Sequence, residues 1–157
     1  RDLHSFPTRR SSDLLTSHVN NYFQKIYEPK NKDLKLYITQ SWLNYTTKGG
    51  WHHPHAHQNS FCSGVLYFKA DKKVDKIFFE KSSSYDTNIR IFTDIYHIFN
   101  SSYWSFDTET GMLLIFPSTN IHSVKRKEDD NLRISLSFNT FIKGTLGHHK
   151  GLSELKL

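Results

Sequence analysis

The sequence lacks several features that would point to particular classes of protein. It has one cysteine in 157 residues, Cys62, which excludes a disulfide within the chain and fits a reducing compartment. No apolar run approaches the roughly 18–20 residues that a membrane-spanning helix needs. No signal peptide, internal repeat or low-complexity tract is visible. We therefore expect one globular domain, long enough to bury a core, without a membrane-spanning helix.

Positive charge is in moderate excess, with 21 Lys+Arg against 15 Asp+Glu and a net charge of +6. These residues form no basic stripe, although Lys69, Lys72, Lys73 and Lys76 gather at an expected turn. A solvated turn explains that cluster better than a phosphate-binding patch does. We therefore predict no nucleic-acid surface.

The first fourteen residues, RDLHSFPTRRSSDL, resemble the translation of a sequencing-adapter oligonucleotide. We set residues 1–14 aside as non-native; the alternative is an ordinary disordered N-terminus rich in Ser and Arg. Residues 15–157 are expected to form the single domain, with the natural start of the protein further upstream.

The remaining sequence predicts one helix followed by strands. Leu15, Val19, Tyr22/Phe23 and Ile26 recur at helical spacing, so we predict a helix over Leu15–Tyr27, capped by Thr16 or Ser17 and stopped by Pro29. Alternating or apolar runs predict strands at 34–45, 61–69, 76–80, 112–116, 121–125 and 132–139. We predict a polar loop over 82–88, and the aromatic stretch 89–104 has no clear pattern. Short strands with one helix indicate a mainly β fold, a sandwich or barrel with an N-terminal buttressing helix.

Four of the ten histidines fall within six residues, at His52, His53, His55 and His57, in a predicted loop opened by Gly49-Gly50. Imidazoles at positions i and i+2 can converge on a borderline divalent metal or on ferrous iron. Both His53/His55 and His55/His57 have this spacing. We favour His55 and His57 because they lie closer to the following strand, which leaves His52 and His53 as supporting or solvent-exposed residues.

Two further features lie on successive strands downstream. A strand, a turn at Pro117 and a return strand would aim His122 into the interior of a barrel; the alternative is a core histidine bonded to backbone. Arg133, Ser135 and Ser137 share one face of their strand. A buried arginine is costly unless an anion meets it, and its guanidinium fork suits a carboxylate. The alternative for this strand is a surface position with its polar face in solvent.

Together these residues resemble the 2-oxoglutarate/Fe(II)-dependent oxygenases. His55-Ala-His57, His122 and Arg133-Ile-Ser135 are similar to the His-x-Asp/Glu pair, the distal histidine and the Arg-x-Ser pair of that superfamily. The wider pattern from Trp42 to Asn139 resembles a small family of 2OG-Fe(II) oxygenases in bacteria and their phages.

The resemblance implies a double-stranded β-helix, the jelly-roll or cupin-like barrel. It implies three Fe(II) ligands: His55, His57 and His122. It also implies a set of side chains that bind the cosubstrate 2-oxoglutarate: Arg133 and Ser135 at its C5 carboxylate, with Tyr67 and Asn44 as helpers.

The implied reaction consumes O₂ and 2-oxoglutarate, releases succinate and CO₂, and hydroxylates a C–H bond. The cytoplasm of a bacterium or of a phage-infected host is the expected location. The sequence does not indicate the substrate or the oligomeric state, and we expect substrate specificity to reside partly in the loop 81–104.

One departure from the superfamily concerns His57, which stands where a carboxylate ligand is expected. Three neutral histidines would leave more positive charge on the iron. A cupin-type metal enzyme that does not use 2-oxoglutarate is an alternative, because Gly49-x5-His55-x-His57 matches the opening of the first cupin motif. The glutamate of that motif is absent from residues 58–62, and Arg133 has no role in the usual cupin scheme. A non-catalytic jelly-roll module is the third possibility.

Overall fold

The structure is a computed structural model that describes residues 9–81 and 92–157. The helix α1 spans Arg9–Tyr27, and a 3-10 helix, η2, spans His149–Gly151. The strands in chain order are β1 Lys35–Thr46, β2 His52–His55, β3 Cys62–Lys69, β4 Lys76–Glu80, β5 Tyr103–Asp107, β6 Leu113–Pro117, β7 Ile121–Val124, β8 Arg133–Lys143, β9 Thr145–Leu146 and β10 Leu155–Lys156. The predicted loop 82–88, the first part of the stretch 89–104 and residues 1–8 lie outside the described residues. No helix of the described ranges is long and apolar enough to cross a membrane.

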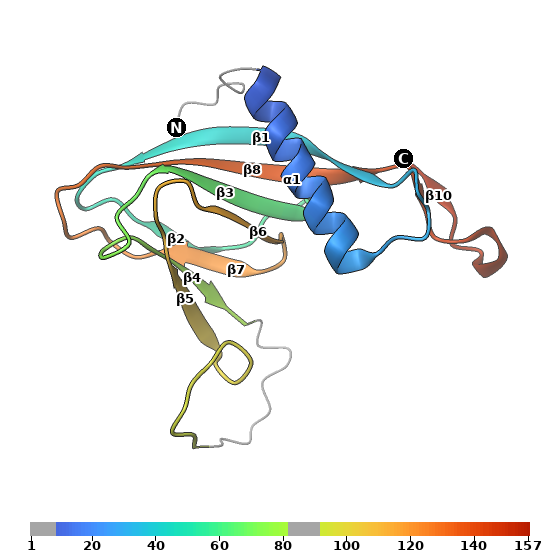
Figure 1. Cartoon of the computed structure of the whole chain (residues 1–157). Helices are drawn as coiled ribbons and strands as arrows, with labels where there is room; N and C mark the ends of the chain where they lie inside the picture. The colour runs from blue at the N-terminus through green and yellow to red at the C-terminus, as the bar shows by residue number, and fades with distance from the viewer. Residues whose placement is uncertain (1–8, 82–91) are drawn as a thin grey trace.

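Two four-stranded antiparallel sheets face each other (Figure 1). One has the order β1-β8-β3-β6 and the other β2-β7-β4-β5, while β9 and β10 form a separate pair. Val65, Tyr67 and Phe116 of the first sheet pack against Ile77 of the second, which places an apolar cluster between the sheets. The prediction of a mainly β fold with one N-terminal helix is therefore confirmed.

The helix α1 crosses the outer face of the first sheet (Figure 1). Leu15, Val19 and Phe23 are buried there against a second apolar cluster that includes Leu136 and Phe138 of β8. The predicted apolar face is thus largely correct, but Ile26 is 61% exposed. The prediction that Thr16 or Ser17 caps the helix was wrong, because the helix already begins at Arg9. Arg9 lies within residues 1–14, which we had set aside as non-native.

Two strands differ from the sequence-based expectation. His52–His55, expected in a loop, is the short strand β2, paired with β7 through His52–Val124 and His55–His122. The strand β5 begins in the last two residues of the stretch 89–104, which had no clear pattern, and pairs with β4. The strand β8 runs to Lys143, four residues beyond its predicted end, because β1 pairs with it along its whole length.

Successive side chains of β8 point to opposite faces of the sheet, so the two faces of this strand contact different parts of the molecule. Leu136 and Phe138 point toward α1 and are at most 1% exposed. Arg133 and Ser135 lie on the other face, toward the second sheet, and each is 6% exposed. The predicted period-two pattern is confirmed, and the solvent-exposed alternative for Arg133 is excluded.

Candidate functional site

Three histidines from two parts of the chain meet between the sheets. His55 ends β2, His57 follows it, and His122 lies on β7, where it pairs directly with His55. Their ring centroids are 4.3 Å apart for His55–His122, 5.0 Å for His55–His57 and 5.1 Å for His57–His122. One ligand atom from each lies within 4.8 Å of the others, so the three imidazoles could hold a metal ion.

Hydrogen bonds to backbone fix the orientation of two of these rings. The Nδ1 atom of His55 lies 2.8 Å from the carbonyl oxygen of His53, and Nδ1 of His122 lies 3.0 Å from that of Asn120. Because a carbonyl oxygen can only accept, each Nδ1 carries the proton and each Nε2 keeps a lone pair for a metal. Burial lowers the pKa of His122 to about 4, opposed by its bond to Asn120 and reinforced by the charges of His55 and His52.

The third imidazole is positioned through its backbone. The N–H of His57 donates to the carbonyl oxygen of Ser118, 3.0 Å away, in the turn after β6. The Ser118 hydroxyl is fully buried and bonds to the hydroxyls of Ser63 and Ser60 at 2.8 and 2.7 Å. Ser63 also donates to Asn139 on β8 at 2.8 Å. This polar network ties the segment after β2 to the first sheet.

The side chains predicted for the cosubstrate lie in rows on the inner face of that sheet. Ser135 pairs with Asn44 on β1 and with Tyr67 on β3, so the three share one row and one face. Thr46 pairs with Arg133 in the next row. All of these residues line the same cavity as the three histidines.

Arg133 is almost completely buried, and its guanidinium is only partly satisfied. Nη2 donates to the hydroxyl of Thr46 at 3.3 Å, and Nη1 lies 3.6 Å from a carboxylate oxygen of Asp75. Nε is buried and has no hydrogen-bond partner among the described residues. A buried donor of this kind is costly unless a ligand accepts from it, so Arg133 suits an anionic ligand in the cavity.

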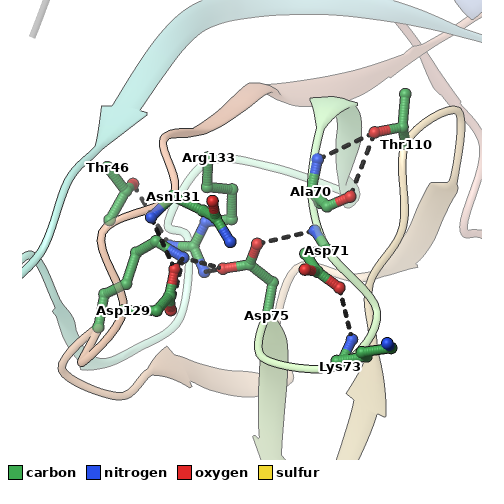
Figure 2. A network of polar contacts seen from close by, with 10 residues as sticks. Thr46, Ala70, Asp71, Lys73, Asp75, Thr110, Asp129, Asn131 and Arg133 are labelled. Atoms are coloured by element: carbon green, nitrogen blue, oxygen red, sulfur yellow. Dashed lines mark hydrogen bonds and ion pairs between the residues drawn. The ribbon is translucent and has the colours of Figure 1, made fainter.

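Sequence reasoning missed the charged residues behind Arg133 (Figure 2). Lys127 lies 2.9 Å from Asp75 and 2.7 Å from Asp129, and the side chains of Lys127 and Asp75 are each 2% exposed. The N–H of Asp71 donates to the second oxygen of Asp75 at 3.0 Å. Asp75 is thereby held in place next to the arginine. Asp75 lies between the predicted strands 61–69 and 76–80, whereas Lys127 and Asp129 lie between 121–125 and 132–139, and the sequence offered no signal that these two connections meet.

Hydrogen bonding outweighs burial at Lys127. Burial alone would lower the pKa of Lys127, but its hydrogen bonds to Asp129 and Asp75 raise it above the ordinary value. The ammonium therefore stays charged, and it compensates the carboxylate that faces Arg133.

The walls of the cavity are mainly apolar. Trp42 is buried, and its ring centroid lies 5.8 Å from that of His57. Trp51 also lines the cavity but is 60% exposed, at the rim of the cavity. Trp104 lines a different groove. Burial raises the pKa of Tyr67 to about 12, although the charge of Arg133 opposes this, so the hydroxyl keeps its proton at neutral pH.

The residues present fit a divalent metal. Imidazole nitrogens suit borderline divalent metals and ferrous iron, and the fixed Nδ1–H groups leave Nε2 available on two of the three rings. Among the described residues that line the cavity there is no Asp or Glu. The carboxylate of Asp75 lies beside Arg133 and is engaged by Lys127. Among the residues that the structure describes, His57 and not an acid is therefore the candidate for the third ligand.

Comparison with known proteins finds a matching family. The sequence pattern of the family described as "Putative 2OG-Fe(II) oxygenase" matches residues 40–139. No curated protein matches the chain in sequence.

Two solved structures are similar in fold. One is an oxidoreductase of the 2OG-Fe(II) oxygenase family from Burkholderia pseudomallei, with 12% identity and a TM-score of 0.58 over 87% of this chain and 60% of that one. The other is HygX from Streptomyces hygroscopicus with nickel and 2-oxoglutarate bound, with 10% identity and a TM-score of 0.50 over 83% of this chain and 66% of that one. The chain thus spans 60% of the length of the first of these proteins.

At such low identity the two structures show the fold, which is the double-stranded β-helix that the family resemblance implied. The family match shows more than the fold, because it covers well over half of the chain and includes every residue of the candidate site. The chain belongs to the 2OG-Fe(II) oxygenase family that this pattern describes.

Proposed function

We propose that the protein is an Fe(II)- and 2-oxoglutarate-dependent dioxygenase that hydroxylates a C–H bond and releases succinate and CO₂. Fe(II), 2-oxoglutarate and O₂ are the cofactor and cosubstrates that go with its family. The nickel and 2-oxoglutarate bound to HygX, which has a similar fold, support the same assignment.

The observation that carries the proposal is the position of Arg133. It is 6% exposed, its Nε has no partner among the described residues, and it lines the cavity that the three histidines also line. A metal site alone does not need a buried guanidinium. A dicarboxylate that reaches both the metal and an arginine accounts for the two features together.

The residues of the chain then have distinct tasks. His55, His57 and His122 would hold Fe(II), and the bound metal with 2-oxoglutarate supplies the chemistry of O₂ activation. Arg133 donates to the distal carboxylate of 2-oxoglutarate, and Ser135 adds a hydroxyl donor in the neighbouring row.

Other side chains prepare the cavity. Tyr67, which keeps its proton, and Asn44 flank Ser135 and can each donate a hydrogen bond to the cosubstrate. The apolar side chains of Trp42, Val65 and Phe116 restrict water around the reacting groups.

The direct test is the conversion of 2-oxoglutarate to succinate by Fe(II)-loaded protein in air. We expect turnover in the wild type and loss of bound iron together with turnover in His55→Ala. In Arg133→Met the KM for 2-oxoglutarate should rise by about 10- to 150-fold, since charge-assisted hydrogen bonds contribute about 1.5–3 kcal/mol. Arg133→Lys keeps the positive charge but loses the planar guanidinium, so its KM for 2-oxoglutarate should lie between those of the wild type and Arg133→Met.

Arg126→Met is the matched control, because Arg126 is exposed and does not line the histidine cavity. Its kinetics should equal those of the wild type. Metal binding without any turnover of 2-oxoglutarate would instead favour the cupin-type enzyme. A protein that binds no transition metal would favour the non-catalytic module.

A further inference from the structure

The candidate iron site leaves two neighbouring histidines without a role. His52 is half-buried and His53 is exposed, both on β2. The ring centroids of His52 and His53 lie 5.1 Å apart. They lie 4.4 Å and 5.2 Å, respectively, from the ring centroid of His55. Together with the inner histidines they make a continuous cluster of five imidazoles.

His55 is shared by two sets of three. One is the inner triad already described; the other is an outer triad of His52, His53 and His55, whose ligand atoms also lie within 4.8 Å of one another. The irregular pairing of β2 with β7 between His52 and His55, where Pro54 lies, brings adjacent strand residues into one cluster.

His55 can serve only one triad at a time. Its Nδ1 donates to the carbonyl oxygen of His53 at 2.8 Å, so the single remaining lone pair is on Nε2. Occupation of either triad therefore withdraws His55 from the other.

We propose that His52, His53 and His55 form a second site for a borderline divalent metal such as Zn(II), an alternative to the inner site. Three imidazoles with one open position suit Zn(II), which is four-coordinate and accepts nitrogen ligands. The outer triad lies nearer to solvent than the inner one, because His53 is exposed whereas His122 is 6% exposed. The proposal does not depend on the use of 2-oxoglutarate.

The test disables the inner triad and asks whether Zn(II) still binds. His57→Asn/His122→Asn removes two inner ligands and leaves the outer triad intact. Equilibrium dialysis with Zn(II) should show one ion per chain bound to this variant. Adding His53→Asn should weaken the binding by at least about tenfold, because even the loss of a supporting partner of a metal ligand costs 10- to 100-fold in affinity.

Adding His148→Asn instead is the matched control, since His148 is also exposed but lies near the C-terminus, outside the cluster. It should leave Zn(II) binding unchanged. Equal binding with and without His53→Asn would overturn the outer site. If the double variant does not fold, His57→Asn alone, which keeps the buried imidazole, carries the same comparison.

The wild type tests the sharing of His55. It should bind one Zn(II) per chain at saturation, whereas two ions per chain would contradict mutual exclusion.

Discussion

At the scale of single residues, the site depends on buried charges that compensate one another. Arg133, Asp75 and Lys127 are each nearly inaccessible to solvent, and Asp129 completes the set. An unpaired charge in such a position would be strongly destabilising. Asp75 therefore has two roles: it is the counter-ion of Lys127, and its carboxylate holds the guanidinium of Arg133 in place.

Lys127→Met should destabilise the fold by about 3–5 kcal/mol, because it leaves buried carboxylate charge without its partner. Lys76→Met is the control: Lys76 pairs with Asp107 at 2.6 Å, but both side chains are more than 40% exposed. An exposed pair contributes about 0–1 kcal/mol. Urea denaturation of the two variants measures the difference, and equal losses would contradict the argument.

The Lys127–Asp129 pair also predicts a dependence on pH. The hydrogen bond from Lys127 holds the pKa of Asp129 below its ordinary value of 3.8. A carboxyl group with a depressed folded pKa stabilises the fold above its unfolded pKa, and loses that contribution as the pH falls through the folded value. Asp129→Asn should thus be less stable than the wild type at pH 7.

That difference in stability should shrink as the pH is lowered below 3.8. Denaturation curves of both proteins at pH 7, 5 and 3 provide the comparison. A difference that stays constant or widens toward acid pH would show that Asp129 acts through something other than its charge.

At the scale of elements, the attachment of α1 to β1 is specified by one polar side chain among apolar contacts. The amide of Asn20 donates to the carbonyl oxygen of Leu36 at 2.9 Å and accepts from its N–H at 2.9 Å. This satisfies both backbone groups of Leu36 on the outer edge of the sheet, where β1 has no further strand neighbour.

Asn20→Ala should cost about 1–3 kcal/mol, because it leaves backbone groups of Leu36 unsatisfied under the helix. Asn21→Ala, next to it on the exposed side of α1, should change stability by no more than about 0.5 kcal/mol. Thermal or urea unfolding distinguishes the two. Similar effects from both substitutions would mean that helix propensity, and not the contact with Leu36, decides the result.

The elements differ in how well the sequence predicts them. Strands with a clear apolar or alternating run, such as Lys76–Glu80, are found where expected. His52–His55 has no such run and contains a proline, so only its pairing with β7, distant in sequence, makes it a strand. Tyr103–Asp107 likewise owes its conformation to β4. Local patterns do not encode these long-range pairings.

At the scale of the whole molecule, the two sheets supply different halves of the candidate site. His55 and His122 belong to the β2-β7-β4-β5 sheet, while Arg133, Ser135 and Asn44 belong to the facing one. The sequence predicted the principal residues of each half because His55 belongs to a short His-x-His motif, and Arg133 and Ser135 form an Arg-x-Ser motif. It could not predict Asp75 beside Lys127, 52 residues away, since nothing local marks two turns that meet only in the folded chain.

If both halves of the site bind one 2-oxoglutarate molecule, the affinity for 2-oxoglutarate depends on the metal and on Arg133, and calorimetric titration measures this dependence. Ni(II) replaces Fe(II) so that no turnover occurs. 2-Oxoglutarate should bind to the Ni(II)-loaded wild type, and this binding should weaken on the order of tenfold or more when the metal is removed. We expect a comparable loss of affinity in Ni(II)-loaded Arg133→Met. Binding of 2-oxoglutarate that is indifferent to both the metal and Arg133 would contradict this expectation.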